Sequence, residues 1–346
     1  MRMTTFRTYI QTGMTEKSEE KRYGRTLAIV VPCYNEQEIL PKTVSVLSEY
    51  LLSLVEKGKI SGSSFLLFVN DGSADDTLKI LKERSKAVKN VCYISLSRNC
   101  GHQNALMAGL STACPLSDMI VSIDADLQDD VNVIEQMVDE YADGAEIVYG
   151  VRGSRKSDTF FKRGTAQTYY RVLKSMGVKT IYNHADFRLM GKAAVEELLR
   201  YREKNLYIRG LIPELGFKTA SVNYERKARE AGESKYPFNK MLALALNGIT
   251  SFSIKPLRLI ISIGAAVMII CLLAAAYAFI SYLSGHVEKG WTSLILSIWF
   301  LGGVQLLSIG VIGEYIGKIY SEVKDRPLYC IEESDLKAAG EKMPGE

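Results

Sequence analysis

The sequence is poor in the residues from which zinc and redox centres are built. Its 346 residues include only three histidines and six cysteines, and no two cysteines form a Cys-x-x-Cys pair. A zinc site of the usual cysteine and histidine type is therefore excluded. We interpret the cysteines as reduced thiols with mainly structural roles.

The glycine-rich loops that hold phosphates in many nucleotide-binding proteins are also absent. Pro32–Glu36 stands after the first predicted strand, where a dinucleotide-binding fold would carry Gly-x-Gly-x-x-Gly. No Gly-Lys-Ser/Thr loop of the Walker type occurs in the chain. If this protein binds a nucleotide, a metal ion and carboxylates must hold its phosphates.

Charge is missing from two long stretches in the C-terminal part of the chain. Leu259–Leu283 and Trp291–Gly313 contain no Asp, Glu, Lys or Arg, and each is longer than the roughly 20 residues that cross a bilayer. They predict two transmembrane helices joined by the short hairpin Ser284–Gly290. The alternative is a pair of buried core helices, but core helices of this length usually carry a polar stripe.

The flanking charges predict how this hairpin is oriented. Lys255 and Arg258 precede the first stretch, and three basic residues follow the second: Lys318, Lys324 and Arg326. Because basic residues accumulate on the cytoplasmic side, both chain termini are expected there. The segment Met1–Arg25 lacks the apolar core of a signal peptide, so export of the following domain is not expected.

The net charge of +4 is too small to indicate nucleic acid as a partner, and no nucleic-acid-binding motif is present. Basic residues nevertheless gather in two groups, Arg152–Lys174 and Arg226–Lys240. Beside a membrane such groups attract anionic headgroups, at about 1 kcal/mol per basic residue, although a solvated basic face is the alternative. Phe161–Met176 and Tyr236–Ser253 fit amphipathic helices that lie in the membrane interface or pack on the sheet.

Between Leu27 and Gly150 short apolar runs alternate with helical patterns. We expect strands at Leu27–Val31, Phe65–Val69, Val91–Leu96, Met119–Ile123 and Glu146–Tyr149, and helices at Glu36–Val55, Ala74–Ala87, Gln103–Thr112 and Val131–Tyr141. Nearly continuous apolar strands that alternate with helices predict an α/β fold with a doubly wound, mostly parallel sheet. In such sheets ligands bind at the carboxyl ends of the strands.

Polar clusters follow four of these strands. The most informative cluster is Asp124–Asp130, where the apolar run Met119–Ile123 ends abruptly in carboxylates. An Asp-x-Asp turn at the end of a strand suits a divalent cation that holds a diphosphate, with one carboxylate on the metal and the other free to reach a ribose. Taken alone, the same residues could be turn formers or helix caps.

Four motifs occur in order along the chain: Val31–Glu36, Asn70–Asp75, Ser97–Gln103 and Asp124–Asp129. Together with the two apolar stretches, this set resembles the family 2 glycosyltransferases of the polyprenyl-phosphate type, the enzymes similar to dolichyl-phosphate mannose synthase. It is most similar to the bacterial undecaprenyl-phosphate glucosyltransferases. The resemblance covers about Leu27–Arg326.

The resemblance implies a nucleotide-sugar-binding domain of the GT-A type with a mostly parallel central sheet, followed by interfacial amphipathic helices and two transmembrane helices. We expect a disordered or flexible N-terminal segment (1–25), a cytoplasmic catalytic domain (26–229), a juxtamembrane amphipathic segment (230–256), a transmembrane hairpin (257–317) and a cytoplasmic C-terminal tail (318–346). Disorder is expected before Arg25 and after Glu332.

The resemblance also implies an activity. The enzyme would move a hexose, glucose from UDP-glucose, to undecaprenyl or another polyprenyl phosphate with inversion, using Mg²⁺ or Mn²⁺. It would lie in the bacterial inner membrane as a homo-oligomer, for example a tetramer, with the catalytic domain and both termini in the cytoplasm. Other sugars stay open, namely an N-acetylhexosamine, mannose or a modified arabinose.

Site residues are carried over from the resemblance by position. The nucleotide-sugar would be bound by Pro32, Tyr34, Glu36, Asp71 and Asp124, and the metal by Asp126 and Gln128. Asp126 and Asp186 would be the catalytic residues, and Asp186 lies in a segment similar to the family's Asp-Phe-Arg-Leu. We expect Asp186 to orient the sugar rather than to accept a proton. His102 is interpreted as a structural residue in a loop beside the nucleotide.

A lipid phosphate acceptor needs no strong general base, because its second pKa lies near about 6 and it is largely dianionic at neutral pH. It needs positioning and charge compensation, which arginine and lysine supply. From their place after the last predicted strand, we expect Arg152, Lys162 and Arg163 to bind this phosphate. The resemblance adds Lys235, in a Gly-x-Ser-Lys-Tyr segment at the membrane edge.

Two other functions share part of the pattern. A processive polysaccharide synthase would carry more spans and a Gln-x-x-Arg-Trp motif, which this sequence lacks. A non-catalytic membrane module that senses a nucleotide-sugar would have little reason to keep both Asp124 and Asp126. A transferase to a lipid phosphate is distinguished from these two functions by nucleotide binding that requires a divalent metal and by a lipid-soluble sugar product.

Overall fold

The computed structural model describes residues 24–153, 184–204, 207–225, 255–284 and 290–336. They belong to two compact units. The first, here called the α/β unit, comprises Met1–Arg163, Thr180–Lys235 and Pro327–Glu346, and the second, the hairpin unit, comprises Gly164–Lys179 and Tyr236–Arg326.

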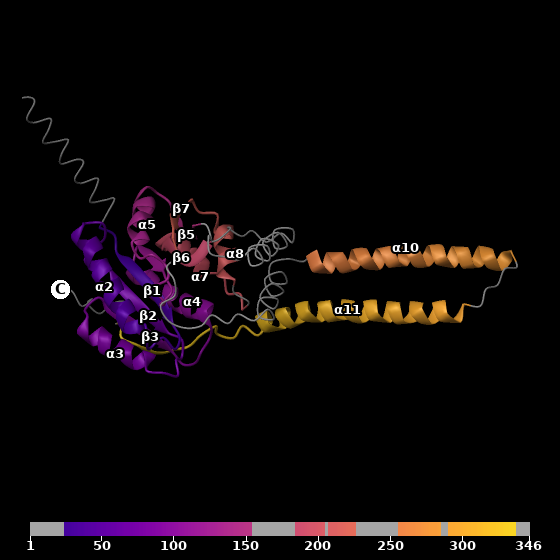
Figure 1. Ribbon diagram of the computed structural model, residues 1–346, viewed down its shortest axis with the longest axis horizontal. Helices are drawn as coiled ribbons and strands as arrows, with labels where there is room; N and C mark the ends of the chain where they lie inside the picture. The colour runs from indigo at the N-terminus through magenta and orange to yellow at the C-terminus, as the bar shows by residue number, and fades with distance from the viewer. Residues whose placement is uncertain (1–23, 154–183, 205–206, 226–254, 285–289, 337–346) are drawn as a thin grey trace, which may run out of the picture. The chain divides into compact units, whose positions relative to one another are not determined.

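An eight-stranded sheet with the order β7-β5-β6-β4-β1-β2-β3-β8 forms the centre of the α/β unit (Figure 1). The strands are β1 (Leu27–Cys33), β2 (Phe65–Asn70), β3 (Val91–Leu96), β4 (Met119–Ser122), β5 (Ile147–Arg152), β6 (His184–Gly191), β7 (Thr219–Tyr224) and β8 (Ile331–Ser334). β1 pairs in parallel with both β2 and β4, and β2 pairs in parallel with β3. All five strands predicted from the sequence are confirmed.

Helices cover both faces of this sheet. They are α2 (Leu40–Glu56), α3 (Thr77–Ala87), α4 (His102–Ala113), α5 (Val133–Ala142), α7 (Lys192–Leu199) and the short α8 (Ile208–Leu211). Apolar side chains of α2, α3 and α5 join one core cluster with the β1 and β2 side chains of one face. α4 packs on β1 and β2 from the other face and contacts α7. The doubly wound α/β prediction is therefore confirmed for the described residues.

Three strands were not predicted from the sequence: β6, β7 and β8. β7 pairs in parallel with β5 at one edge of the sheet. β6 lies between β4 and β5 and runs antiparallel to each of them. β8 pairs antiparallel with β3, at the edge of the sheet. The expectation of disorder after Glu332 is wrong for Glu333 and Ser334, which lie in β8, because this strand gains backbone and side-chain partners on β3.

The position of β6 determines where its first residues lie. Ser122 at the end of β4 is in register with Arg188 of β6. Because the two strands are antiparallel, the start of β6 lies beyond the carboxyl end of β4. Asp186 is thereby brought to the edge of the sheet where the polar clusters of β1, β2 and β4 are found.

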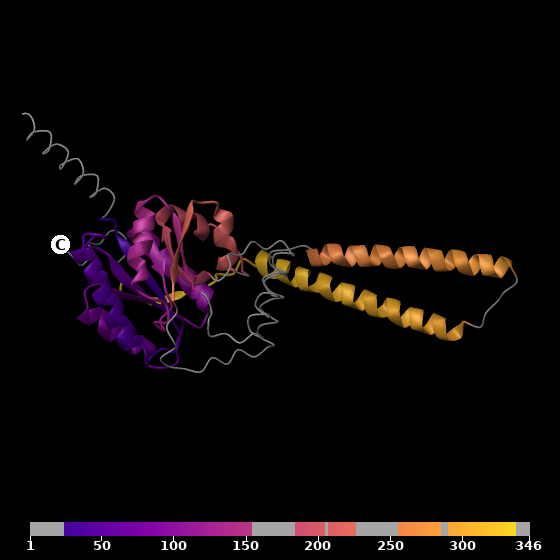
Figure 2. The same ribbon diagram turned by 45° about the horizontal axis from the view of Figure 1, so that its top comes forward.

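The hairpin unit contains two helices that contact each other, α10 (Lys255–Leu283) and α11 (Trp291–Val323), which Figure 2 shows as long, separate rods. Among the described residues one helical stretch, Phe300–Val323, is long and apolar enough to cross a membrane, and it is not buried against other parts of the chain. Ile260–Ile270 in α10 is a shorter apolar stretch. The predicted span Leu259–Leu283 stays a prediction. The two predicted interfacial helices, Phe161–Met176 and Tyr236–Ser253, lie outside the described residues.

The close packing of α4 on the sheet gives a stability prediction. A Cβ at Gly109 would overlap Val30 Cγ1 and lie 2.8 Å from Val69 Cγ2. Gly109→Ala is expected to lower the free energy of unfolding by about 1–3 kcal/mol, the usual cost of overpacking a core. Gly62→Ala is the control, because the nearest atom to a Cβ there is Val55 Cγ1 at 3.9 Å. Urea unfolding in detergent, followed by circular dichroism, would contradict this account if both variants lost the same stability.

Candidate active site

The loops that follow β1 and β2 are joined by hydrogen bonds. The Asn35 backbone N–H donates to Ser73 Oγ at 3.0 Å, and the Ala74 N–H donates back to Asn35 Oδ1 at 2.9 Å. The Glu36 N–H donates to Thr77 Oγ1 at 2.9 Å. Asn35 has a left-handed backbone conformation, with φ of 54°, in which a non-glycine residue is uncommon. The two motifs therefore form one connected platform.

Asp71 lies beneath a third loop, which follows β3. Its side chain accepts hydrogen bonds from the backbone N–H groups of Cys100, at 2.7 Å, and Gly101, at 2.9 Å. Gly72 makes this contact possible, because its φ is +61° and a Cβ there would lie 2.5 Å from the Asn99 backbone nitrogen. Asp71 is 2% exposed, and this burial raises its pKa although the two hydrogen bonds act in the opposite direction.

The other nucleotide-binding residues predicted from the sequence lie at the same edge of the sheet. Pro32 is in β1, in register with Val69 of β2, and Tyr34 follows it with 47% of its surface exposed. Tyr34 and Glu36 are thus on the platform, whereas the Asp71 side chain accepts hydrogen bonds from the backbone of the neighbouring loop 97–101. The resemblance implies that Asp71 binds the nucleotide-sugar, and its hydrogen bonds to the loop 97–101 were not predicted.

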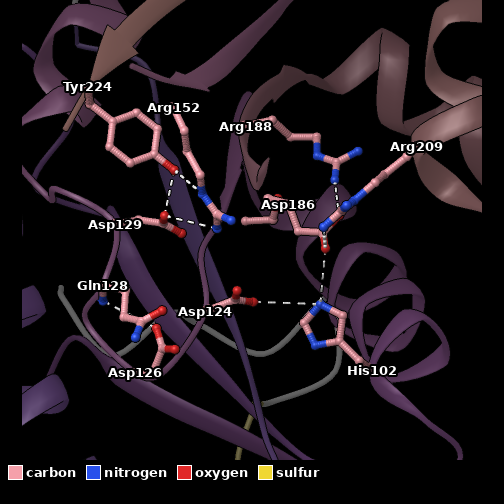
Figure 3. Close-up of polar contacts among 11 residues, drawn as sticks. His102, Asp124, Asp126, Gln128, Asp129, Arg152, Asp186, Arg188, Arg209 and Tyr224 are labelled. Carbon is pink, nitrogen blue, oxygen red and sulfur yellow. Dashed lines mark hydrogen bonds and ion pairs between the residues drawn. The ribbon is translucent and has the colours of Figure 1, made fainter. Parts of the chain in front are cut away.

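The acidic turn comprises Asp124–Asp130, immediately after β4 (Figure 3). Asp126 Oδ1 accepts a hydrogen bond from the Gln128 backbone N–H at 3.2 Å. Leu127 between them has a left-handed conformation, with φ of 52°, which is costly for a branched side chain and characteristic of functional turns. Gln128 is 6% exposed. The turn thus holds the carboxylate of Asp126 against the backbone of Gln128.

The donors of this turn fit a hard divalent cation. Asp124, Asp126 and Gln128 all offer oxygen atoms, the ligands that Mg²⁺ and Mn²⁺ prefer. Within the described ranges, however, no three His, Cys, Asp or Glu side chains are close enough together to hold a metal by themselves. Such a site needs further ligands, and the oxygens of a bound diphosphate are the usual ones for Mg²⁺.

Asp186 lies opposite the acidic turn in a cluster of arginines. Its side chain accepts hydrogen bonds from Arg188, at 2.5 Å, and from Arg209, at 3.0 and 2.7 Å. Its backbone oxygen accepts a hydrogen bond from Ser122 Oγ at 2.6 Å. Burial alone would raise the pKa of Asp186, but the two arginines outweigh it and hold the pKa far below its usual value. Asp186 is therefore ionised at neutral pH and is a weak base.

His102 connects the two sides of the site. It is the first residue of α4, and its Nε2 lies 3.7 Å from Asp124 Oδ1 and 4.0 Å from Asp186 Oδ2 (Figure 3). Burial raises the pKa of Asp124, nearby carboxylates raise it further, and His102 acts in the opposite direction. The interpretation of His102 as a residue that only shapes a loop missed this position between the two carboxylates.

Arg152 already has partners, namely Asp129 of the acidic turn and Tyr224 of β7. Its Nη2 lies 3.3 Å from Asp129 Oδ1 and its Nε donates to the Tyr224 hydroxyl at 3.3 Å, while Tyr224 donates to Asp129 at 2.5 Å. Asp129 is 3% exposed. These three residues connect the acidic turn to the ends of β5 and β7. The other acceptor residues predicted, Lys162, Arg163 and Lys235, lie outside the described ranges.

Sequence reasoning missed four residues of this site, namely Arg188, Arg209, Asp129 and Tyr224. Arg188 and Asp129 stand inside motifs that were noted, so their charge was a usable signal. Arg209 and Tyr224 lie in a part of the chain without a regular pattern. Only the fold brings them to the acidic turn and to Asp186.

The ion pairs of Asp186 give a stability prediction. Asp186→Asn removes the carboxylate beside Arg188, whose side chain is 0% exposed, and should destabilise the fold by about 3 kcal/mol, because breaking a buried pair leaves an uncompensated charge. Since the folded pKa is depressed, this contribution is present above the unfolded pKa of about 3.9 and is lost as pH falls further. Unfolding of both proteins between about pH 5.5 and pH 9 should show a constant difference in stability. A difference that appears only above about pH 7 would contradict the assignment.

The contacts of Arg152 give a second prediction. Arg152→Gln should lower the free energy of unfolding by about 2 kcal/mol, because the buried carboxylate of Asp129 loses its positively charged partner. The double variant Arg152→Gln/Asp129→Asn should recover part of this loss, since the buried charge is removed with its partner. Urea unfolding of the two single variants and the double variant measures the coupling, and strictly additive losses would count against the pair.

Two family models match parts of this chain. Residues 28–199 match the family model "Glycosyl transferase family 2", and residues 255–319 match "GtrB C-terminal hairpin". The solved structure of glucosyl-3-phosphoglycerate synthase from Mycobacterium tuberculosis is 18% identical and covers 66% of this chain and 78% of its own, with a TM-score of 0.43.

Two relatives are similar over nearly the whole chain. The uncharacterized glycosyltransferase YkoT of Bacillus subtilis (strain 168) is 53% identical over 312 residues, which are 90% of this chain and 93% of the relative. The SfII prophage-derived bactoprenol glucosyl transferase of Shigella flexneri is 41% identical over 313 residues, which are 89% of this chain and 98% of the relative. This chain accordingly belongs to glycosyl transferase family 2 and is a glycosyltransferase with a GtrB-type C-terminal hairpin.

Proposed function

We propose that the protein transfers glucose from UDP-glucose to undecaprenyl phosphate, or another polyprenyl phosphate, with inversion and with the help of Mg²⁺ or Mn²⁺. One observation carries the proposal: the acidic turn of β4 and the ionised Asp186 of β6 face each other across His102, at 3.7 and 4.0 Å. A relative that is 41% identical over most of this chain is named a bactoprenol glucosyl transferase.

The donor would lie on the platform of the first two motifs, with its diphosphate at the acidic turn. Tyr34 is exposed there and can contact a base, and Asp71 keeps the loop 97–101 in place beside it. In this proposal Asp126 and Gln128 bind the metal, which supplies Lewis-acid stabilisation of the leaving diphosphate. Asp124, at the start of the turn, reaches toward the ribose and the phosphates.

Asp186 would orient the sugar. Its depressed pKa makes it a poor proton acceptor, and a lipid phosphate that is largely dianionic at neutral pH needs none. The carboxylate and its two arginines instead give a rigid arrangement of charge beside the anomeric carbon. Attack by the acceptor from the face opposite the leaving diphosphate inverts this carbon, so an α-linked donor gives a β-linked product.

The hairpin unit would hold the enzyme in the plane of its lipid substrate. We propose that α10 and α11 both span the bacterial inner membrane, with the catalytic domain and both termini in the cytoplasm, as the flanking basic residues predict. Five glycines of α11 face open space within the chain: Gly302, Gly303, Gly310, Gly313 and Gly317. They permit close packing against a second copy, so a homo-oligomer, for example a tetramer, is part of the proposal.

The metal and donor assignment predicts the behaviour of Asp126. Asp126→Asn should lower metal-dependent transfer of labelled glucose from UDP-glucose into organic-extractable undecaprenyl phosphate by at least about a hundredfold, because charge stabilisation of the leaving group is worth several kcal/mol. Asp143→Asn, an exposed carboxylate after α5, is the matched control and should keep wild-type activity. If the wild-type enzyme transfers sugar only from another UDP- or GDP-sugar, the identity of the donor sugar must be revised. Full activity of Asp126→Asn would overturn the assignment of Asp126 to the metal.

The acceptor assignment predicts a different kinetic pattern. Lys162→Gln and Arg163→Gln should each raise the KM for the lipid about tenfold, since a charge-assisted hydrogen bond contributes roughly 1.5–3 kcal/mol. The KM for the nucleotide-sugar should hardly change. Lys235→Gln belongs to the same series. Equal effects on both KM values would show that these residues do not act at the acceptor phosphate.

A further inference from the structure

The end of the described chain returns to the sheet. Pro327–Leu336, here called the C-terminal segment, follows α11 but belongs to the α/β unit. Its strand β8 pairs antiparallel with β3, with Ile331 opposite Leu96 and Ser334 opposite Ile94. An edge strand of this kind satisfies backbone groups that β3 would otherwise expose. The occupant of the β3 edge is therefore a segment of this same chain.

Side chains make this pairing specific. The Tyr93 backbone N–H donates to Asp335 Oδ1 at 2.7 Å, and the Tyr93 hydroxyl donates to Glu333 Oε1 at 2.6 Å. Glu333 also forms an ion pair with Lys82 of α3 at 2.6 Å. On the other side of the sheet the Tyr329 hydroxyl lies 2.8 Å from Ser111 Oγ of α4. The segment is thus attached to β3 and to one helix on each face.

The segment also contacts a loop of the candidate active site. The Ser97 backbone N–H donates to the Cys330 carbonyl oxygen at 3.0 Å. Ser97 begins the loop 97–101, and at the end of this loop the N–H groups of Cys100 and Gly101 donate to Asp71. The loop is consequently held at one end by the C-terminal segment and at the other by Asp71.

A second set of contacts connects the C-terminal segment with the platform through β3. Ser95, which is in register with Glu333 of the C-terminal segment, accepts a hydrogen bond from Asn70 Nδ2 at 2.9 Å. Asn70 directly precedes Asp71, and its Oδ1 accepts a hydrogen bond from the Ser73 N–H at 3.2 Å. Ser73 in turn belongs to the platform of the first two motifs. Removal of β8 would leave these contacts on an edge strand.

We propose that the C-terminal segment is a positioning element of the nucleotide site, which holds the loop 97–101 and Asp71 in the arrangement that accepts the nucleotide. Ordering one backbone residue costs roughly 1–2 kcal/mol, so a loop that is already ordered before binding raises affinity. The inference rests on the proposed function only where it names a uridine nucleotide as the ligand.

Hydrogen exchange tests the contact without any ligand. A chain ended after Arg326 keeps all of α11 and loses the C-terminal segment. Its amides at Cys100 and Gly101 should exchange at least about tenfold faster than in the full chain, because faster local opening exposes them. A synthetic peptide with the sequence of Pro327–Leu336 should restore protection when added in excess, and a peptide with both Glu333→Ala and Asp335→Ala should not.

Nucleotide affinity tests the functional consequence. Calorimetry with UDP and Mn²⁺ should give a Kd about tenfold higher for the shortened chain, and the peptide should reverse this change. In the full chain, Glu333→Ala/Asp335→Ala should raise the Kd several-fold, whereas Glu332→Ala, exposed on the same strand, should not change it. These full-chain variants decide the question if the shortened chain does not fold.

The outcomes are separable. Unchanged exchange at Cys100 and Gly101 together with an unchanged Kd, in a shortened chain that is folded by circular dichroism, would overturn the proposal. A lower melting temperature with unchanged Kd would show a purely structural role and would also overturn it. If the full chain binds no uridine nucleotide, the proposed function fails, while the exchange measurement still decides the role of the segment.

Discussion

The candidate active site depends on one constraint, the antiparallel insertion of β6 between β4 and β5. If β6 ran parallel to β4, Asp186 would lie at the opposite end of the sheet from the acidic turn. The antiparallel direction places it beside Asp124, and the hydrogen bond from Ser122 Oγ to the Asp186 carbonyl oxygen holds the two strand ends together at 2.6 Å. Arg188, buried within the same strand, supplies the charge that allows a carboxylate to remain ionised there. The direction of β6 in the sheet therefore determines that Asp186 lies beside the acidic turn.

The two carboxylates at this junction have opposite environments. Arg188 and Arg209 lower the pKa of Asp186, whereas burial and the neighbouring carboxylates raise the pKa of Asp124. Pairs of groups with diverging pKa values often have different roles in one reaction. Around Asp186 positive charge is already provided by the chain. Around Asp124 and Asp126 negative charge is in excess, which favours a divalent cation brought in with a diphosphate.

Much of the fold could be predicted because β1 to β4 are short, nearly continuous apolar runs between amphipathic helices, and the motifs at their ends occur in a specific order. The helices α2, α3 and α5 begin later than predicted. Before α2, for example, the Glu36 backbone N–H donates to Thr77 Oγ1 at the start of α3. β6 was missed because its motif follows a segment without periodicity, and β8 because Ile331–Ser334 has only one apolar residue. Their partners lie far away in the sequence. The same reason hides Arg209 and Tyr224, and it explains why Arg152, placed by position alone beside an acceptor phosphate, is found paired with Asp129.

In the proposed function, the acidic turn holds a metal together with the donor diphosphate rather than by itself. Electron paramagnetic resonance of Mn²⁺ titrated into the full-length protein tests it most directly, with and without UDP-glucose. The account predicts weak Mn²⁺ binding to the protein alone and at least about tenfold tighter binding when UDP-glucose is present, because the described chain offers too few ligands of its own. Mn²⁺ binding of the same strength with and without the nucleotide-sugar would contradict it.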